Sequence, residues 1–406
     1  MTDTTDAKPV SQRLLSVDAL RGFDMFWIIS AEALVQALAR MSQTPVVQFL
    51  ATQMEHADWE GFRFYDLIFP LFLFIVGVSI VLSMDRMLAT SGRKGALIRI
   101  AKRSVLLFVL GMFYYGGVTR AWPDVQLAGV LPRIALCYFF VATLYVLLSR
   151  KALVGVAVLC LVGYWALLMF VPFPDVHLQH DKVGKRETQA QAKTPEVLLA
   201  NVTTTVRGTF EEGHNLTHYV DFRWLPGKKR NLYYTNEGLL STLPSVATTL
   251  LGVMAGWLLT SARWSGKQKA VWLLAAGAVG VGLGLLWGLE FPIIKRLWTS
   301  SYVLLAGGYS AMLLGVFYLV VDVWQMRAWC LPFVWMGTNA ITIYLVDNIL
   351  GGFNGIAARL VGGNVQQFAD AHITQGCGDL LIALMGLLIS FWFVRFLYKN
   401  KIFLRV

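Results

Sequence analysis

The chain has 406 residues, of which 56% are hydrophobic and only 15% are charged. A soluble domain normally carries about 25% charged residues, so this composition and the mean hydropathy of +0.58 exclude an ordinary soluble protein. The net charge of +11 does not indicate a nucleic-acid partner, because in a membrane protein the distribution of lysine and arginine matters more than their sum. The composition predicts an all-α, polytopic helical membrane protein embedded in a lipid bilayer.

Apolar residues fall into segments of roughly 20 residues, the length of helix that crosses the hydrocarbon core of a bilayer. These segments predict about ten transmembrane helices with a polar bundle interior, all within one transmembrane domain over residues 1–406. No cleavable signal peptide is expected. The predicted spans are 18–38, 64–84, 103–119, 127–148, 152–171, 239–260, 270–289, 301–321, 332–351 and 378–398.

Ten crossings place both termini on the same side of the membrane, and lysine and arginine decide which side that is. Seventeen of them lie in the loops and tails on the side of the termini. Since positively charged loops stay in the cytoplasm, both termini of this multi-pass protein are predicted to be cytoplasmic. The short loops on the opposite side hold six, which are Arg40, Arg63, Arg120, Lys295, Arg296 and Arg359.

Residues 172–238 form one long polar segment between two predicted spans, on the extracytoplasmic side. Its aromatic and acidic residues, among them Trp224 and Glu237, suit a lid that contacts a sugar, and an ordered loop with interfacial aromatics explains them as well. The histidines of HNLTH (214–218) lie in a loop rich in glycine and asparagine. They and the four scattered cysteines are expected to be structural, so no metal site is predicted.

Ionisable side chains within the spans are informative because each costs roughly 2.5–3.5 kcal/mol on insertion scales unless it is paired or hydrated. Asp18 and Arg21 are three residues apart and share a helix face, which suits an ion pair or a site. Glu32, near the far end of the first span, is expected to line a polar cavity. Arg103 and Arg133 are placed to hold phosphate or carboxylate groups, although Arg103 could also extend to the interface. The predicted polar interior fits an anionic ligand.

The stretch MEHADWEGFRFYD (54–66) concentrates ionisable groups immediately before the second span. His56 is its single histidine, and histidine suits proton transfer because it changes charge near neutral pH. A carboxylate can orient the ring, and Asp58, Glu60 and Asp66 are all candidates for this role. The predicted topology places His56 on the extracytoplasmic side, where a purely structural role is the competing interpretation.

Several motifs match one family in the same order along the chain. The most specific are HADWEGFRFYDLIFPLFLFIVGVSI (56–80) and FPIIKRLWTSSYVLLAGGYS (291–310). RLLSVDALRGFDM (13–25), LAGVLPRIALCYF (127–139), NEGLLSTLPSVATTLLGVMAG (236–256) and WMGTNAITIYLV (335–346) complete the match. With these motifs the chain resembles the heparan-α-glucosaminide N-acetyltransferase family over about residues 13–350.

The resemblance implies that cytosolic acetyl-CoA donates its acetyl group to the amine of a glucosamine-type sugar outside the cytoplasm. It makes His56 the catalytic residue, as a base or as an acetyl carrier, with Asp58 or Asp66 beside it. The positions expected to bind acetyl-CoA are Arg21, Arg103, Arg133, Lys295, Trp298, Ser301, Tyr302 and Asn339. Those expected to contact the sugar are Glu32, Trp59, Trp224 and Glu237.

The animal lysosomal members of this family carry a further N-terminal domain and span before the first motif. The sequence here therefore predicts a bacterial inner (plasma) membrane homologue that acts on small amino sugars, and relatives suggest a homodimer. The main alternative is a secondary transporter of amino sugars or N-acetylated sugars, in which buried carboxylates such as Asp24 couple transport to protons. The sequence shows no two-fold internal repeat of the kind that marks many transporters.

Overall fold

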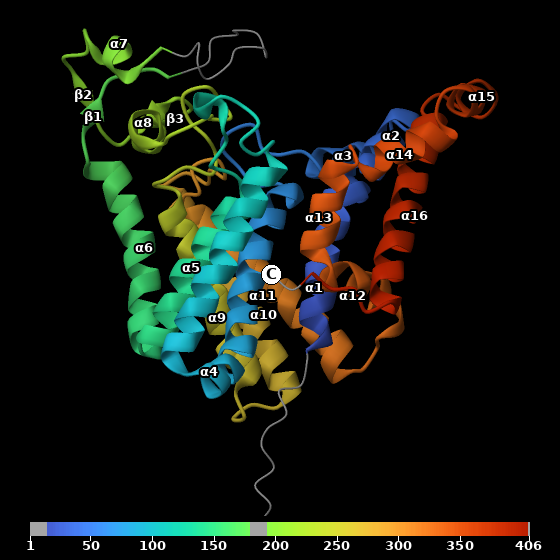
Figure 1. Ribbon diagram of the computed structural model, residues 1–406, viewed down its shortest axis with the longest axis horizontal. Coiled ribbons are helices and arrows are strands. Elements are labelled where there is room, and N and C mark those ends of the chain that lie inside the picture. The colour runs from blue at the N-terminus through green and yellow to red at the C-terminus, as the bar shows by residue number, and fades with distance from the viewer. Residues whose placement is uncertain (1–13, 179–192, 405–406) are drawn as a thin grey trace, which may run out of the picture.

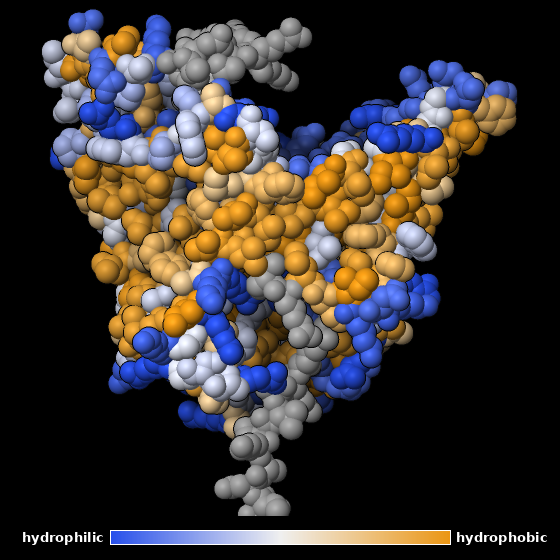
Figure 2. Space-filling model, in the orientation of Figure 1, coloured by the Kyte–Doolittle hydropathy of each residue, from blue (hydrophilic) through white to orange (hydrophobic). Residues whose placement is uncertain are grey.

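The structure is a computed structural model that describes residues 14–178 and 193–404. Helices form a bundle, and the segment between α6 and α9 lies over one of its ends (Figure 1). On the face shown in Figure 2, an apolar band crosses the middle of the bundle between two hydrophilic ends. This distribution is typical of a protein whose apolar band faces lipid.

The first span is continuous through α1 (Leu15–Phe26), the π-helical turn η1 (Trp27–Ala31) and α2 (Glu32–Met41). It is followed by α3 (Pro45–Gln53), η2 (Phe64–Leu67) and α4 (Ile68–Tyr114). The remaining elements are η3 (Trp122–Asp124), α5 (Val130–Leu147), α6 (Arg150–Phe170), β1 (Phe173–Pro174), α7 (Pro195–Leu199), β2 (Thr205–Val206), β3 (Phe210–Glu211), β4 (His214–Asn215), α8 (Leu216–Trp224), α9 (Thr242–Thr260), α10 (Gly266–Gly288), α11 (Ser300–Phe317), η5 (Tyr318–Val323), η6 (Ala328–Cys330), α12 (Leu331–Thr338), α13 (Ala340–Ile349), α14 (Phe353–Val361), α15 (Asn364–His372) and α16 (Cys377–Lys399).

The long helix α4 folds back on itself. Gly92, at φ 61° and ψ 179°, interrupts its 47 residues, which would measure about 70 Å as one straight helix. Tyr114, the last residue of α4, stacks on Tyr344. Tyr344 lines the same cavity as Tyr65, which lies just before the first residue of α4. The two halves of α4 therefore run in opposite directions and correspond to the predicted spans 64–84 and 103–119.

The number of spans agrees with the prediction from sequence. In the described part of the chain, eight helical segments are long and apolar enough to cross a membrane, and the pair α12–α13, bent by 66°, makes a ninth. One of the eight runs from Phe64 to Tyr114, and its fold-back supplies a tenth crossing. Each predicted span thus coincides with a helix, and the all-α polytopic fold class is confirmed.

The segment between α6 and α9 contains the only strands in the described ranges, 14–178 and 193–404. β1 pairs with β2, and β3 pairs with β4, each pair antiparallel and two residues long. Phe173 and Leu216 of this segment pack with Tyr164 and Leu168 of α6 and with Phe291. This small apolar cluster attaches the segment to the end of the bundle.

Glycine allows α4 and α9 to pack backbone against backbone. A Cβ added to Gly77 would lie 2.0 Å from the carbonyl oxygen of Thr249, and one added to Gly252 would lie 1.9 Å from that of Phe74. Such close approach is the usual role of small residues between membrane helices. It brings the start of α4, and with it the stretch 54–66, firmly against the bundle core.

Replacing Gly77 by valine should lower the stability of the folded protein by at least about 1–3 kcal/mol, the usual cost of overpacking. Gly155→Val in α6 is the matched control, because nothing lies within 4 Å of a Cβ added there, while the intrinsic cost of valine in a helix is the same. Thermal unfolding in detergent measures both. Equal unfolding temperatures for the two variants would contradict the close α4–α9 contact.

Candidate active site

His56 lies in the loop between α3 and η2, at the end of the bundle that carries the 172–238 segment. Gly61 turns this loop with φ 117°, a conformation that favours glycine. The Gly61 N–H donates to the carbonyl oxygen of Ile293 at 2.9 Å, so the loop is attached to the turn between α10 and α11. The side chain of His56 is 50% exposed, which leaves the ring accessible to a substrate.

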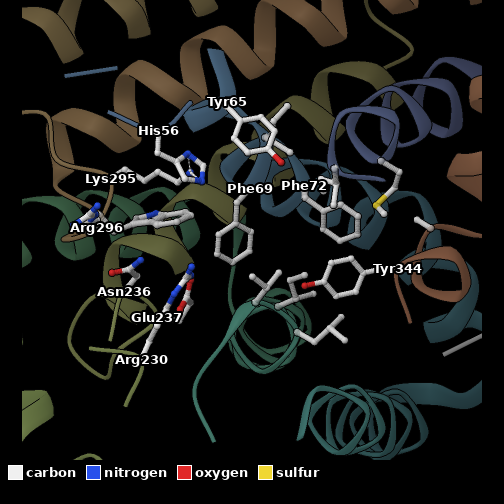
Figure 3. Close-up of a pocket in the computed structure, with 18 of the residues that line it drawn as sticks. His56, Tyr65, Phe69, Phe72, Arg230, Asn236, Glu237, Lys295, Arg296 and Tyr344 are labelled. Atoms are coloured by element: carbon white, nitrogen blue, oxygen red, sulfur yellow. Dashed lines mark hydrogen bonds between the residues drawn. The ribbon is translucent and has the colours of Figure 1, made fainter. Parts of the chain in front are cut away.

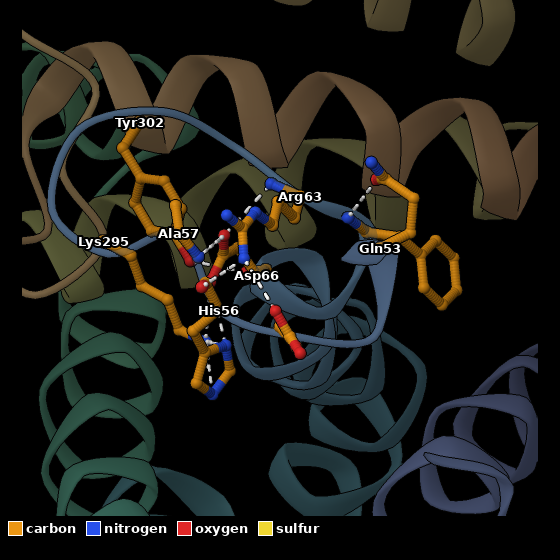
Figure 4. Close-up of polar contacts among 9 residues, drawn as sticks. Gln53, His56, Ala57, Arg63, Asp66, Lys295 and Tyr302 are labelled. Carbon is orange, nitrogen blue, oxygen red and sulfur yellow. Dashed lines mark hydrogen bonds and ion pairs between the residues drawn. The ribbon is translucent and has the colours of Figure 1, made fainter. Parts of the chain in front are cut away.

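The partner of His56 is Asp66, whose side chain is fully buried (Figure 4). Its Oδ1 lies 2.9 Å from Nδ1 of His56. Its Oδ2 accepts hydrogen bonds from the backbone N–H groups of Ala57 at 3.2 Å and Arg63 at 3.0 Å. One carboxylate therefore fixes both the loop and the ring, whereas Asp58 and Glu60, the other two candidates, have exposed side chains. Of the three, Asp66 is the carboxylate that contacts the His56 ring.

Lys295 completes a three-residue cluster with His56 and Asp66. Its Nζ lies 2.9 Å from Nδ1 and 3.4 Å from Nε2 of His56, and 3.3 Å from Oδ1 of Asp66. Because Nδ1 cannot donate to Asp66 and accept from Lys295 at once, the ring has two hydrogen-bonding states. In the first, Nδ1–H donates to Asp66 and Nε2 carries the free lone pair. In the second, Lys295 donates to Nδ1 and the hydrogen sits on Nε2.

Burial also changes the pKa of Lys295. Desolvation lowers its pKa to about 8, even though the neighbouring Asp66 carboxylate acts in the opposite direction. Lysine in water titrates near pH 10.4, so Lys295 changes charge much closer to neutrality than an exposed lysine. The sequence predicted Lys295 to bind acetyl-CoA, and the structure places its Nζ against the His56 ring and the residue in the lining of a cavity.

A cavity of about 360 Å³ opens beside this cluster, and we call it the His56 cavity. Figure 3 shows its polar side, with Lys295 and Arg296 next to His56. Its polar lining continues with Arg230, Asn236 and Glu237, all from the end of the 172–238 segment. Sequence reasoning singled out Glu237 but not the other two, because they stand in a polar loop without any distinctive spacing.

The opposite side of the His56 cavity is aromatic, with Tyr65, Phe69, Phe72 and Tyr344 (Figure 3). The Tyr65 ring lies 4.9 Å from that of His56. Sequence reasoning missed Tyr65, although its position one residue before Asp66 was a usable signal. One cavity thus combines a basic and polar wall with an apolar one.

A second cavity of about 320 Å³, the Arg103 cavity, lies deeper in the bundle. Arg21, Arg103 and Asn339, three of the positions predicted to bind acetyl-CoA, line it together with Ser79 and Ser83. Arg21 donates to the hydroxyl of Ser79 at 2.8 Å. The two cavities adjoin, because five residues line both, namely Phe72, Leu131, Ile134, Ala340 and Ile341.

Other residues predicted to bind acetyl-CoA pack in or next to the wall of the His56 cavity. Arg133 is buried, donates to the carbonyl oxygen of Gly238 and the hydroxyl of Ser241, and lies over the ring of Trp298. It is absent from the lining of both cavities in the described structure. Trp298 lines the His56 cavity. Tyr302 donates its hydroxyl to the backbone oxygen of Asp66 at 2.7 Å.

Ser301 likewise holds the turn before α11, since its hydroxyl donates to the carbonyl oxygen of Pro292 at 3.2 Å. Of the predicted sugar contacts, Glu32 interacts with the Tyr65 hydroxyl. Trp59 donates its indole N–H to the backbone oxygen of Phe210 at 2.9 Å. Trp224 is 58% exposed and lies outside the lining of the two cavities described here.

Comparison with known proteins agrees with the motifs. A family model described as a domain of unknown function (DUF5009) matches residues 13–182. Heparan-alpha-glucosaminide N-acetyltransferase from Homo sapiens is 28% identical over 389 residues, 87% of this chain, and the Mus musculus protein of that name is 27% identical over the same share. The chain spans only 56% of the length of these relatives. The resemblance predicted from the motifs is confirmed, because over most of its length the chain is similar to the heparan-alpha-glucosaminide N-acetyltransferases of these two species.

Proposed function

We propose that this protein is a transmembrane N-acetyltransferase. It transfers the acetyl group of cytosolic acetyl-CoA to the amine of a glucosamine-type sugar on the extracytoplasmic side. The observation that carries the proposal is the His56–Asp66–Lys295 cluster at a cavity that adjoins a second, arginine-lined cavity. The names of the relatives support the reaction class.

The Arg103 cavity fits the phosphates of the donor. Two guanidinium groups, those of Arg21 and Arg103, line it, and guanidinium suits phosphate in geometry and charge. Buried Nε of Arg103 and Oδ1 of Asn339 have no hydrogen-bond partner among the residues that the structure describes, although buried polar groups are normally paired. Both atoms are therefore available to a bound molecule, and the shared apolar wall suits the pantetheine arm.

In the proposed reaction, Nδ1–H of His56 donates a hydrogen bond to Asp66, which leaves the lone pair of Nε2 facing the acceptor. A sugar ammonium first loses one proton to solvent. His56 then takes a second proton from the amine as the amine nitrogen attacks the thioester carbonyl. The carbon–sulfur bond breaks, and the leaving thiolate takes that proton from His56, so the reaction releases one net proton. Charged Lys295 stabilises the oxyanion that forms on the carbonyl oxygen.

His56 could also carry the acetyl group covalently on Nε2 before the amine attacks. Both routes use the same atoms, and they differ in kinetics. Ping-pong kinetics and a trapped acetyl-enzyme indicate the covalent route, whereas a ternary complex indicates direct transfer. The acceptor in either route contacts the polar wall formed by Arg230, Asn236 and Glu237.

Proteoliposomes test the proposal directly. Vesicles with one protein orientation receive acetyl-labelled acetyl-CoA on the side of the termini and glucosamine on the other side. We expect labelled N-acetylglucosamine to accumulate with the glucosamine, and none when N-acetylglucosamine replaces it as acceptor, because its amine is already blocked. Absence of any labelled product would overturn the proposal, and sugar uptake without acetyl-CoA would support a transporter instead.

The pH profile should report Lys295. As the pH rises through about 8, Lys295 loses its proton and its charge, so we expect kcat to fall on this alkaline limb. Lys295→Gln should lower kcat near pH 7 by about 10²-fold, within the usual loss for one oxyanion donor, and should abolish the alkaline limb. The acceptor amine titrates identically in both proteins, so it cannot account for the difference.

Lys228→Gln, in the 172–238 segment, is the control for this comparison, and its profile should match the wild type. The measurement is the initial rate of acetyl transfer across the pH range at saturating donor and acceptor. An alkaline limb that persists unchanged in Lys295→Gln would show that another group titrates there.

A further inference from the structure

The 172–238 segment carries a second group of chemically active side chains, separate from the His56 cluster. Asp175 and His177 follow β1, and His214 begins β4. Nε2 of His214 lies 2.8 Å from Oδ1 of Asp175, and Nε2 of His177 lies 3.7 Å from the same oxygen. We propose that Asp175, His177 and His214 bind a divalent transition-metal ion, with zinc as the preferred ion.

The spacing of the three ligand atoms fits such an ion. Zinc bonds to histidine nitrogen and carboxylate oxygen measure about 2.0–2.2 Å, so two ligands of a tetrahedral zinc lie roughly 3.3–3.5 Å apart. The measured separations of 2.8 and 3.7 Å lie on either side of that value. The candidate atoms of all three residues fall within 4.8 Å of one another. The rings of His177 and His214 stack at 4.0 Å between centroids, so the exposed His177 ring must turn out of this stack for both nitrogens to face one ion.

Polar groups stand beside two of the ligands, where metal sites usually have supporting partners. Metal-binding histidines typically present their second nitrogen to a carboxylate or a carbonyl group. Nδ1 of His214 lies 3.9 Å from a carboxylate oxygen of Glu211, which is within ion-pair range but longer than a hydrogen bond. Oδ2 of Asp175 accepts a hydrogen bond from the hydroxyl of Thr204 at 3.4 Å. The backbone N–H of Asp175 donates to the carbonyl oxygen of Thr204.

The site is open on one side. The side chain of His214 is 10% exposed, whereas that of His177 is 61% exposed. Three protein ligands with an open fourth position are typical of zinc sites that keep a water or bind a substrate group. Two imidazoles and one carboxylate favour zinc and similar transition metals over magnesium or calcium, which prefer oxygen alone.

The expectation of no metal site considered His214 together with His218, and the structure separates these two histidines. His218 is buried, accepts a hydrogen bond at Nδ1 from the Gly213 N–H, and stacks on Tyr234 at 3.7 Å. Burial lowers the pKa of His218 to about 3, so this ring stays neutral. The residues proposed to bind the metal together with His214 lie instead almost 40 positions earlier in the chain.

A metal ion here would stiffen one wall of the His56 cavity. His214 belongs to the β3–β4 hairpin, whose Phe210 carbonyl oxygen accepts from the Trp59 indole. Glu212, in the turn of the same hairpin, pairs with Arg296 at 2.7 Å, and Arg296 lines the cavity. This link to catalysis rests on the proposed function, whereas metal binding itself does not.

Zinc content tests the site independently of any activity. The full chain, purified in detergent without a polyhistidine tag, is stripped with a chelator and dialysed against zinc, and bound metal is measured by elemental analysis. We expect one equivalent in the wild type. His177→Ala and His214→Ala should each bind zinc at least tenfold more weakly, and His372→Ala, an exposed histidine in α15, should match the wild type.

Asp175→Asn keeps the test valid if His214→Ala fails to fold, because it preserves shape and removes one charged ligand. The absorption spectrum of bound cobalt adds a second measurement, since intense bands indicate a tetrahedral site containing nitrogen ligands. The proposal is wrong if the wild type retains no more zinc than the His177→Ala/His214→Ala double variant. It is also wrong if His372→Ala loses as much zinc as either ligand variant.

Discussion

Replacing His56 by alanine should lower kcat for acetyl transfer by about 10²–10⁴-fold, the usual contribution of a general acid–base residue. The variant lacks the group that accepts the proton of the acceptor amine, while the arginines of the second cavity and their donor contacts are unchanged. The KM for acetyl-CoA should therefore change little. The measurement is the initial rate of labelled acetyl transfer to glucosamine over a range of donor concentrations.

His372→Ala serves as the control for loss of a histidine, because His372 is exposed at the end of α15. Unfolding temperatures of both variants show whether the fold is intact. Since the His56 side chain is half exposed, its loss should cost little stability. Equal rates in His56→Ala and the wild type would refute the proposed role, and an acetyl-enzyme that still forms in His56→Ala would place the covalent step on another residue.

Replacing Asp66 by asparagine should lower kcat by up to about 10⁴-fold, the effect of the same change in a Ser–His–Asp triad. The asparagine oxygen can take over the two backbone N–H bonds of Ala57 and Arg63. Its NH₂ group then faces His56 and donates to Nδ1. That bond places the ring hydrogen on Nε2, so the nitrogen that should accept the substrate proton has no lone pair.

Asp58→Asn is the matched control for this experiment, because it makes the same chemical change in an exposed carboxylate two residues from His56. It should leave kcat within about twofold of the wild type. NMR of labelled histidine in the purified protein reports the tautomer of His56 and separates the proposed cause from a general structural effect. Equal losses in the two variants would contradict the assignment of Asp66.

Lys295 gives the cluster a property that a simple histidine–aspartate pair lacks. Its ammonium competes with the His56 ring for Asp66 and also reaches the ring nitrogens. When charged Lys295 turns toward a developing oxyanion, it no longer donates to the ring. Nδ1–H of His56 then donates to Asp66, its one remaining partner in the cluster. Formation of the transition state would thus favour the hydrogen-bonding state in which Nε2 is the base.

Local composition was sufficient to predict the helices. Each apolar segment near 20 residues must satisfy its backbone hydrogen bonds internally in lipid, so length and hydropathy alone identified the spans. The sequence did not predict the break at Gly92 or the bend between α12 and α13. The predicted spans nevertheless correspond to the two halves of α4 and to the bent pair.

The roles of single residues were predicted less evenly. His56 was identifiable because its motif is dense in ionisable groups next to an apolar segment. Arg133 and Trp224 have the residue types expected of ligand contacts, yet Arg133 is buried against Trp298 and Trp224 is exposed and outside the lining of the two cavities. Residue type indicates which groups a side chain can bind, but only the packing of the fold determines which groups that side chain contacts.

The amino-acid sequence by itself determined that this chain crosses a membrane many times and carries a histidine among ionisable groups before the second span. Both properties reside in short contiguous stretches, where hydropathy and residue type act locally. Only the tertiary structure decided that Asp66 rather than Asp58 orients His56. It also decided that Lys295, 239 positions away, contacts the ring, and that Asp175 meets His214. These choices depend on how distant loops are held together by hydrogen bonds and backbone packing, which no local pattern encodes.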